Sequence, residues 1–555
     1  MIVDAQGMPI RKLLTEGKYI IPDYQREYDW EEKEIIEFIN DINEISNDES
    51  YFIGHMVFEG KRNGTKYIVI DGQQRITTIT IILCCLRDIF YERKEIDLGN
   101  GINDKYIFSI NDDNKKFARL VNDMPYPVLQ ARVQNIPQEK DNSIVPKKNG
   151  EKKIINAYVK IHSLFQEKTI DELKSFRDKI LNLETVSVVA EGVSNACTIF
   201  MTLNSTGKDL TPLDLVKSLI FSKYKKVPLV NEPNDTWKKI SDNINNNVKF
   251  LNNFYASRYK KVSDKRIFYE VENTIKNLNH KDHGVAAKEF LQQMLEDSEL
   301  FKLINTPVST NFNKNDYDIY ESIYAITKQF KIQVSNSFLI ALIRDYKKNT
   351  VSKSMCIKIL SVMERFHFVN NAVCSKRSSG IDLLYAKYAH DLYQAKSKQE
   401  KHIIITNICQ ELTKRVATLS DFEASVDSKL YYTRKDEKQK ELVKYVLMKL
   451  ERKKNTHSIP IATSIEHIYP ETPKNMTLTD PNLIINIGNL VLLEDSVNSK
   501  IGNKEYDDKK TYVLNNSQMI TAKQLFNKYK SWTDTEIKQR RDELIEEMYK
   551  KMWLK

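Results

Sequence analysis

One segment near the C-terminus constrains the fold more than any other part of the chain. It reads Ser-Ile-Glu-His-Ile-Tyr-Pro over residues 464–470, and it is followed by an apolar run at residues 487–493 and by a polar stretch from Asn498 onward. An apolar run between a loop and a polar segment predicts a strand followed by a helix. We therefore expect the C-terminal region to carry its polar residues on a strand–helix unit.

The residue types in this region suit metal-assisted cleavage of a phosphodiester. His467 is predicted to be the general base, because imidazole is the side chain whose unperturbed pKa lies near neutrality. Glu466 and the side-chain oxygen of Asn498 are predicted to hold Mg²⁺ or Mn²⁺, since Mg²⁺ prefers oxygen ligands and keeps waters in its shell. Asn489 is predicted to orient His467 by accepting a hydrogen bond from its second ring nitrogen. The alternative is a solvated Glu-His pair and a Gly-Asn turn.

This ordered pattern resembles the HNH nuclease domain at the C-terminus of GmrSD-type proteins. The resemblance implies a ββα-metal fold for residues 441–555, although Glu466 stands where HNH enzymes commonly have Asp. The roles that the resemblance implies are catalysis by His467 and Asn489, metal binding by Glu466 and Asn498, and contact with the DNA phosphate by Lys509.

A second group of polar residues lies in the N-terminal part. Residues 70–75 read Ile-Asp-Gly-Gln-Gln-Arg, close an apolar strand and precede a helix predicted to begin near Thr77. A tight turn at this point presents backbone N–H groups at a helix N-terminus, which favours anions. Gly72 permits the turn, Arg75 offers a planar fork of donors for phosphate, and Asp71 is suited to bind a cation or position a water. The alternative is a structural turn in which Asp71 and Arg75 pair and the glutamines cap the helix.

Together with residues 21–30 and 200–210, this turn resembles the N-terminal domain of GmrSD-type proteins, which is related to the ParB/sulfiredoxin-like fold. The resemblance implies binding and hydrolysis of a nucleoside triphosphate, coupled to recognition of modified foreign DNA. It does not distinguish GTP, UTP, CTP and ATP. An ordinary P-loop is excluded, because no segment matches Gly-x-x-x-x-Gly-Lys-Ser/Thr. The roles that it implies are catalysis by Asp71 and Arg75, and nucleotide binding by Gln25, Arg26, Gly72, Gln73, Gln74 and Asn204.

The pattern along the chain predicts an α+β protein of several domains. Residues 1–225 alternate short strands with helices and should form the ParB/sulfiredoxin-like α/β domain. Residues 226–440 have helical spacing and few glycines, which predicts an α-helical connector before the nuclease domain at 441–555. The predicted strands are Tyr19–Ile21, Tyr51–Phe58, Tyr67–Ile70 and Thr185–Val189. The predicted helices include Glu31–Ile45, Thr77–Phe90, Ile319–Phe330, Ser335–Tyr346 and Met355–Phe368.

Composition limits the partners and the compartment. The net charge of +10 is compatible with a polyanionic partner such as double-stranded DNA. The six cysteines show no Cys-x-x-Cys spacing, so neither a zinc knuckle nor a disulfide framework is indicated. The most apolar run, residues 76–86, is far shorter than the roughly 20 residues that a membrane span needs. We therefore expect a soluble cytoplasmic protein without a membrane partner, and a homo-oligomer is possible.

Three functions follow from these patterns. The first is a modification-dependent DNA endonuclease of phage defence, which nicks or cuts through the HNH site under the control of a nucleoside triphosphate. The second is a nucleotide-dependent DNA-binding switch whose C-terminal domain grips phosphate without cleaving it. The third makes the N-terminal domain a nucleotide phosphatase and the only enzyme. His467 separates the first from the others, because binding alone does not require it.

Overall fold

The chain forms two compact units. The computed structural model describes residues 3–22, 25, 27–45, 51–61, 64–122, 128–203, 212–224, 232–245, 249–264, 266–278, 283–376, 379–455 and 462–553. The first unit comprises Met1–Lys239 and Val262–Gln293, and the second comprises Ile240–Lys261 and Met294–Lys555. This division differs from the three predicted domains, because most of the helical connector and the C-terminal region belong to the same unit.

The first unit contains a six-stranded mixed sheet with the strand order β1-β8-β3-β4-β2-β7. Strands β3 and β8 run parallel, whereas β3 and β4 are antiparallel. The four predicted strands correspond to β2, β3, β4 and β8, and the sequence patterns did not predict the others. The strands of the sheet are β1 (Val3–Pro9), β2 (Lys18–Ile21), β3 (Phe52–Glu59), β4 (Lys66–Asp71), β7 (Leu120–Asn122) and β8 (Glu184–Ala190). A separate pair consists of β5 (Phe108–Ile110) and β6 (Lys116–Ala118).

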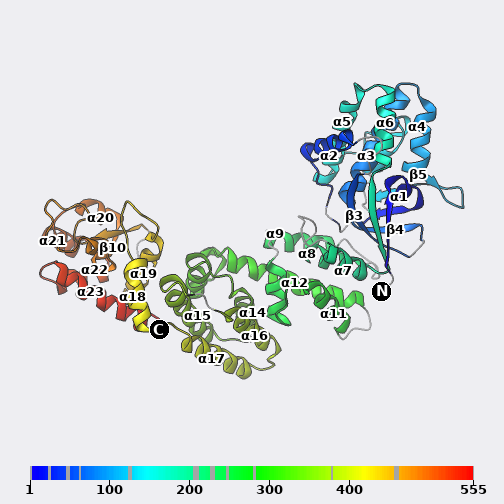
Figure 1. Cartoon of the computed structure of the whole chain (residues 1–555). Coiled ribbons are helices and arrows are strands. Elements are labelled where there is room, and N and C mark those ends of the chain that lie inside the picture. Colours follow the sequence, from blue (N-terminus) through cyan, green and yellow to red (C-terminus); the bar gives the residue numbers. More distant parts are fainter. Residues whose placement is uncertain are drawn as a thin grey trace. The chain divides into compact units, whose positions relative to one another are not determined.

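Helix α3 (Gln73–Glu92) lies at the centre of the first core. Its residues from Ile76 to Phe90 are all buried, so it is enclosed on every side and not only along one stripe. It packs against α4, α5 and α6 (Figure 1). The other helices that begin in the first unit are α1 (Ile10–Glu16), α2 (Glu32–Glu44), α4 (Ile96–Ile102), α5 (Asn149–Gln166), α6 (Ile170–Leu181), α7 (Val193–Leu203), α8 (Pro212–Tyr224), α9 (Glu232–Ile244), α11 (Ile267–Asn277) and α12 (His283–Asn305).

The second unit begins with a bundle of helices. Asp297 is fully buried and pairs with Arg258 at 2.8 Å and with Arg344 at 3.2 Å, which ties α12 to two other helices. The three predicted helices of this region correspond to α13 with the π-helical turn Ala325–Gln329, to α14 and to α15. The helices are α10 (Lys249–Arg258), α13 (Tyr317–Tyr324), α14 (Asn336–Lys347), α15 (Lys353–His367), α16 (Ile381–Gln394), α17 (Lys398–Lys414) and α18 (Leu419–Lys429).

The C-terminal part of the second unit has the order strand, strand, helix. Strands β9 (Thr463–His467) and β10 (Leu490–Glu494) pair antiparallel, and α20 (Asp495–Ile501) follows directly. The predicted strand at 487–493 begins later than expected, because Ile487–Asn489 forms a 3-10 turn. The surrounding helices are α19 (Lys440–Lys454), α21 (Tyr506–Asn516), α22 (Ile520–Lys528) and α23 (Asp534–Glu546).

One apolar core joins this C-terminal part to the helices before it. The core includes Phe368, Phe422 and Leu430 as well as Leu490 and Ile537. The predicted boundary at residue 440 therefore falls at the start of α19 and inside a continuous core. Among the residues that the structure describes, no helix is long and apolar enough to cross a membrane.

Candidate functional site

The polar residues of the C-terminal motif lie at the end of β9. His467 is the last residue of this strand and stands opposite Leu490, while Glu466 stands opposite Val491. Successive side chains of a strand point to opposite faces, so Glu466 shares a face with Ser464 and not with His467. The motif thus divides into a histidine on one side of the strand and a carboxylate on the other.

His467 is fixed by a backbone carbonyl that is distant in the sequence. Its Nε2 lies 2.8 Å from the carbonyl oxygen of Tyr432, and the ring of Tyr432 stacks on the imidazole with centroids 5.5 Å apart. A carbonyl oxygen only accepts, so Nε2 carries the proton and Nδ1 keeps its lone pair. Burial lowers the pKa of His467, and the Tyr432 carbonyl and Glu471 oppose this effect in part. The imidazole is therefore neutral at neutral pH, with its lone pair on Nδ1.

Asn489 does not orient His467 as predicted. This side chain is fully buried, and its Oδ1 accepts from the Tyr469 N–H at 2.7 Å and from Trp532 Nε1 at 2.9 Å. Its Nδ2 donates to the carbonyls of Tyr469 at 3.0 Å and Ile484 at 2.8 Å. Both lone pairs and both amide protons are occupied, so no capacity remains for the imidazole. Asn489 instead holds the loop between the two strands, and the Tyr432 carbonyl takes the predicted orienting role.

Lys509 does not face solvent, contrary to the predicted contact with DNA phosphate. Its side chain is only 1% exposed, and its Nζ donates to Glu466 Oε1 at 2.5 Å and to the His467 carbonyl at 2.6 Å. Burial raises the pKa of Glu466 and lowers the pKa of Lys509, and the attraction between the two groups opposes both shifts. Lys509 therefore positions Glu466 and the end of β9.

Asn498 carries an oxygen that is available for a cation. Its Nδ2 donates to Ser464 Oγ at 2.7 Å, whereas its buried Oδ1 has no hydrogen-bond partner within the described part of the chain. A buried polar atom without a partner costs free energy unless a ligand or water satisfies it. Ser464 and Glu466 share a face of β9, so Asn498 lies on the carboxylate side.

The candidate ligands on this side of β9 are two oxygen atoms, which are hard donors. Glu466 and Asn498 offer one carboxylate and one amide oxygen, and a Mg²⁺ ion completes such a set with waters. Across the described residues, no group of three or more His, Cys, Asp and Glu side chains is arranged to hold a metal. The residues present thus fit a hydrated divalent cation better than zinc.

Sequence reasoning missed the residues that support the site from a distance. Tyr432, Trp532 and Glu471 contact or influence the motif, but the first two lie far from it along the chain. Glu471 accepts from the Arg434 N–H at 2.9 Å and from the Thr433 hydroxyl, which tethers it beside the segment that carries Tyr432. Burial raises the pKa of Glu471, and these hydrogen bonds outweigh the burial, so the net direction is downward.

The N-terminal turn forms as predicted, but the helix starts earlier. Strand β4 ends at Asp71, Gly72 has φ = +92°, and α3 begins at Gln73 and not near Thr77. A Cβ at Gly72 would lie 2.7 Å from Met56 Cγ, so both the conformation and the space require glycine. The first turn of α3 therefore consists of the glutamines and Arg75.

Most groups of this turn are engaged with the protein. Arg75 Nη2 lies 3.2 Å from Asp71 Oδ2, and its Nη1 donates to the Ile53 carbonyl at 2.7 Å. His55 Nε2 lies 3.7 Å from the same Asp71 oxygen. Gln74 accepts from the Asp29 N–H at 2.9 Å and donates to the Glu27 carbonyl at 3.1 Å. The pairing of Asp71 with Arg75 is the contact expected if this motif is a structural turn.

A small polar cavity lies beside the turn. It is lined in part by Gln25, Gln73, Gln74 and Asn122 and has a volume of about 20 Å³, which is room for one water. The buried oxygens Gln25 Oε1 and Asn122 Oδ1 have no hydrogen-bond partner within the described residues. The predicted nucleotide-binding residues Arg26 and Asn204 lie outside the described residues.

Comparison with known families identifies both ends of the chain. Residues 10–221 match the model described as GmrSD restriction endonuclease, N-terminal domain, and residues 416–547 match GmrSD restriction endonucleases, C-terminal domain. Together the two matches cover more than half of the chain. By class this is a restriction endonuclease, which implies DNA as the substrate. The chain belongs to the GmrSD type of restriction proteins, as the motifs predicted. A search of curated proteins found no match.

Proposed function

We propose that this chain is a metal-dependent DNA endonuclease of phage defence that cuts modified foreign DNA at an HNH site around His467. The observation that supports this most is the buried imidazole whose Nε2 is held by the Tyr432 carbonyl, which leaves Nδ1 as a base. Within the described residues the buried Asn498 Oδ1 has no hydrogen-bond partner, and together with Glu466 it supports a cation held by these two residues.

In the proposed reaction, Nδ1 of His467 takes a proton from the water that attacks the phosphorus atom, and the P–O bond to the leaving oxygen breaks. A divalent cation supplies neutralising charge to the phosphodiester and to this oxygen when it is bound. Glu466 and Asn498 would hold the cation. Lys509 keeps Glu466 in place through its short contact, and Asn489 holds the loop that connects the two strands.

We include control by a nucleoside triphosphate in the proposal because of the family resemblance and the motif at residues 71–75. We assign no step of the reaction to the nucleotide. Among the described residues of this region, Gln25 Oε1 and Asn122 Oδ1 have no hydrogen-bond partner and are available to a ligand or a water.

Cleavage of matched modified and unmodified phage DNA in Mg²⁺ tests the proposal. His467→Ala should reduce the cleavage rate by about 10²–10⁴-fold, the usual contribution of a positioned base, and excess chelator should abolish cutting. The control is His402→Ala, which removes an exposed histidine of α17 in the same unit. Undiminished cutting by His467→Ala would refute the assignment of the base. DNA binding or triphosphate hydrolysis without strand breakage would favour the switch or the nucleotide phosphatase.

A further inference from the structure

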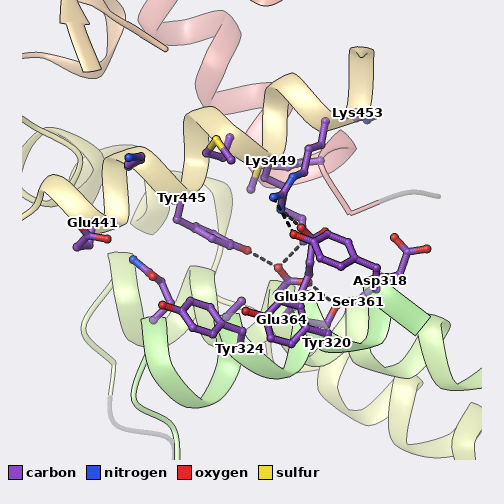
Figure 2. A pocket seen from close by; sticks show the side chains of 18 of the residues that line it. Asp318, Tyr320, Glu321, Tyr324, Ser361, Glu364, Glu441, Tyr445, Lys449 and Lys453 are labelled. Carbon is purple, nitrogen blue, oxygen red and sulfur yellow. Dashed lines mark hydrogen bonds and ion pairs between the residues drawn. The ribbon is translucent and has the colours of Figure 1, made fainter. Parts of the chain in front are cut away.

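A large cavity lies within the second unit, apart from the residues of the HNH motif. Its volume is about 770 Å³, within the range of typical small-molecule sites. Helix α13 and the turn that follows it form one wall, α19 forms the opposite wall, and α15 contributes to the floor (Figure 2). Neither family match assigns a role to this cavity.

The α13 wall presents three aromatic rings. Tyr317, Tyr320 and Tyr324 recur at helical spacing along one face, with ring centroids 5.5 and 5.9 Å apart. The core contacts of the helix are made by Ile319 and Ile323 on another face. Tyr317 and Tyr324 are 46% and 43% exposed, although rings of this size gain free energy from burial. The exposed row of rings is therefore a surface suited to stacking with a flat ligand.

The floor of the cavity is a fully satisfied polar network. Glu364 is only 2% exposed and accepts hydrogen bonds from Tyr445, from Lys449 and, at 3.0 Å, from Ser322. Figure 2 shows the carboxylate between the two walls, with Tyr445 and Lys449 reaching down to it from α19. Because the charge of Glu364 is paired, the floor favours a polar ligand without a strong net charge.

The α19 wall adds charge toward its C-terminal end. Arg452 and Lys453 line the cavity and are partly exposed, and the exposed Lys454 follows them on the same helix. Arg452 pairs with Glu321 of the α13 wall, and Lys453 pairs with Glu547 at 3.3 Å. Aromatic rings beside cations are the combination that proteins use to hold single-stranded nucleic acid, because the rings stack on bases and the cations meet phosphates.

The same helix contacts the strand that carries the HNH motif. Lys444, which lines the cavity, donates to the Thr463 carbonyl at the start of β9 at 2.7 Å. Glu451 of α19 accepts from the backbone N–H groups of Ile520 and Thr521 at 2.8 and 2.9 Å. A ligand held against α19 therefore lies on an element that is bonded to both β9 and α22.

We propose that the cavity receives one unstacked nucleotide of the DNA substrate, with its base against the tyrosine face of α13. This inference rests on the proposed function, because it takes DNA as the substrate. It adds that the second unit contacts a single base of this DNA. Gln329, Ser361 and Glu441 supply groups in the lining that can pair with the edge of the base.

Binding of short DNA duplexes to the full chain tests this inference. One duplex carries a 2-aminopurine opposite an abasic site, so that the base is already unpaired, and a second carries it opposite thymine. All variants are made in the His467→Ala background, so no cutting is needed. We expect the unpaired duplex to bind about tenfold more tightly, the scale of one stacked base, with a change in 2-aminopurine fluorescence.

Tyrosine substitutions separate stacking in the cavity from other effects. Tyr320→Ala with Tyr324→Ala should remove the preference for the unpaired duplex, whereas the same pair changed to Phe should keep it, because the rings remain. Tyr269→Ala removes a ring that is 53% exposed in α11, outside the cavity, and should have no effect. Since both alanine sites are partly exposed, the variant should keep the wild-type melting temperature.

Three results would overturn the inference. The first is equal affinity of the wild-type protein for the two duplexes, and the second is a preference for the unpaired duplex that survives the alanine pair. The third is binding of free triphosphate that disappears in the alanine pair but does not displace either duplex, which would assign the cavity to a free nucleotide. None of these results depends on whether His467 catalyses cleavage, so failure here is distinguishable from failure of the nuclease proposal.

Discussion

The role of each polar residue in this site depends on its partner and not on its type. Asn489 and Asn498 both carry side-chain amides. All four hydrogen-bonding positions of Asn489 are occupied, whereas Oδ1 of Asn498 has no partner among the residues that the structure describes. Only an amide with a vacant oxygen can serve as a ligand. Asn489 therefore stabilises the loop, whereas Asn498 is a candidate ligand.

Metal binding by Asn498 can be measured without cleavage. We predict that Asn498→Ala weakens Mn²⁺ binding to the His467→Ala protein by about tenfold or more, because one of the two candidate protein oxygens is lost. Electron paramagnetic resonance of free Mn²⁺ gives the affinity. Ser464→Ala is the matched control, since it removes the partner of Nδ2 and leaves Oδ1 in place. Unchanged Mn²⁺ affinity in Asn498→Ala would contradict the ligand role.

At the scale of elements, several surrounding elements hold β9 in place. The strand pairs with β10, the Lys444 side chain of α19 bonds its first residue, and Lys509 of α21 bonds its last two residues. The Tyr432 carbonyl adds a fourth contact through His467. These contacts leave the strand little freedom, which is what the proposed alignment of a water with a phosphate would require.

The contact between α21 and β9 should contribute strongly to stability. We predict that Lys509→Ala lowers the free energy of unfolding of the second unit by about 3–5 kcal/mol, because it leaves the Glu466 carboxylate buried without its partner. Urea denaturation followed by circular dichroism measures the change. Lys500→Ala, at an exposed position of α20, should have little effect. Replacing both partners, as Lys509→Met with Glu466→Gln, should recover part of the loss. A single variant as stable as the wild type would contradict the buried pair.

At the scale of the whole molecule, most of the predicted helical connector belongs to the same unit as the C-terminal region. Apolar residues at 368–373 and 417–432 belong to the same core as β10 and α23. A large apolar core of this kind unfolds cooperatively, so its parts should not separate as independent domains. The predicted division at residue 440 was based on a change in the sequence pattern. In the structure the apolar core continues across this position.

This continuity can be tested with fragments. We expect residues 441–555 alone to lack a cooperative unfolding transition and a near-ultraviolet circular dichroism signal, because they expose the apolar surface that residues 368–432 cover. The fragment 240–555, which contains the whole second unit, should keep both signals. A folded 441–555 fragment with a sharp transition would show that the nuclease region is independent.

The amino-acid sequence by itself determined the α+β class, five of the helices, four strands of the sheet, the turn at Gly72 and the family. These depend on local periodicity, on turn chemistry and on the order of residues in short motifs, all of which are visible along the chain. The tertiary structure alone decided which side chains are free to act. Tyr432 reaches His467, Trp532 reaches Asn489 and Lys509 reaches Glu466 across long stretches of sequence. Such contacts arise from packing between elements, so local patterns do not encode them.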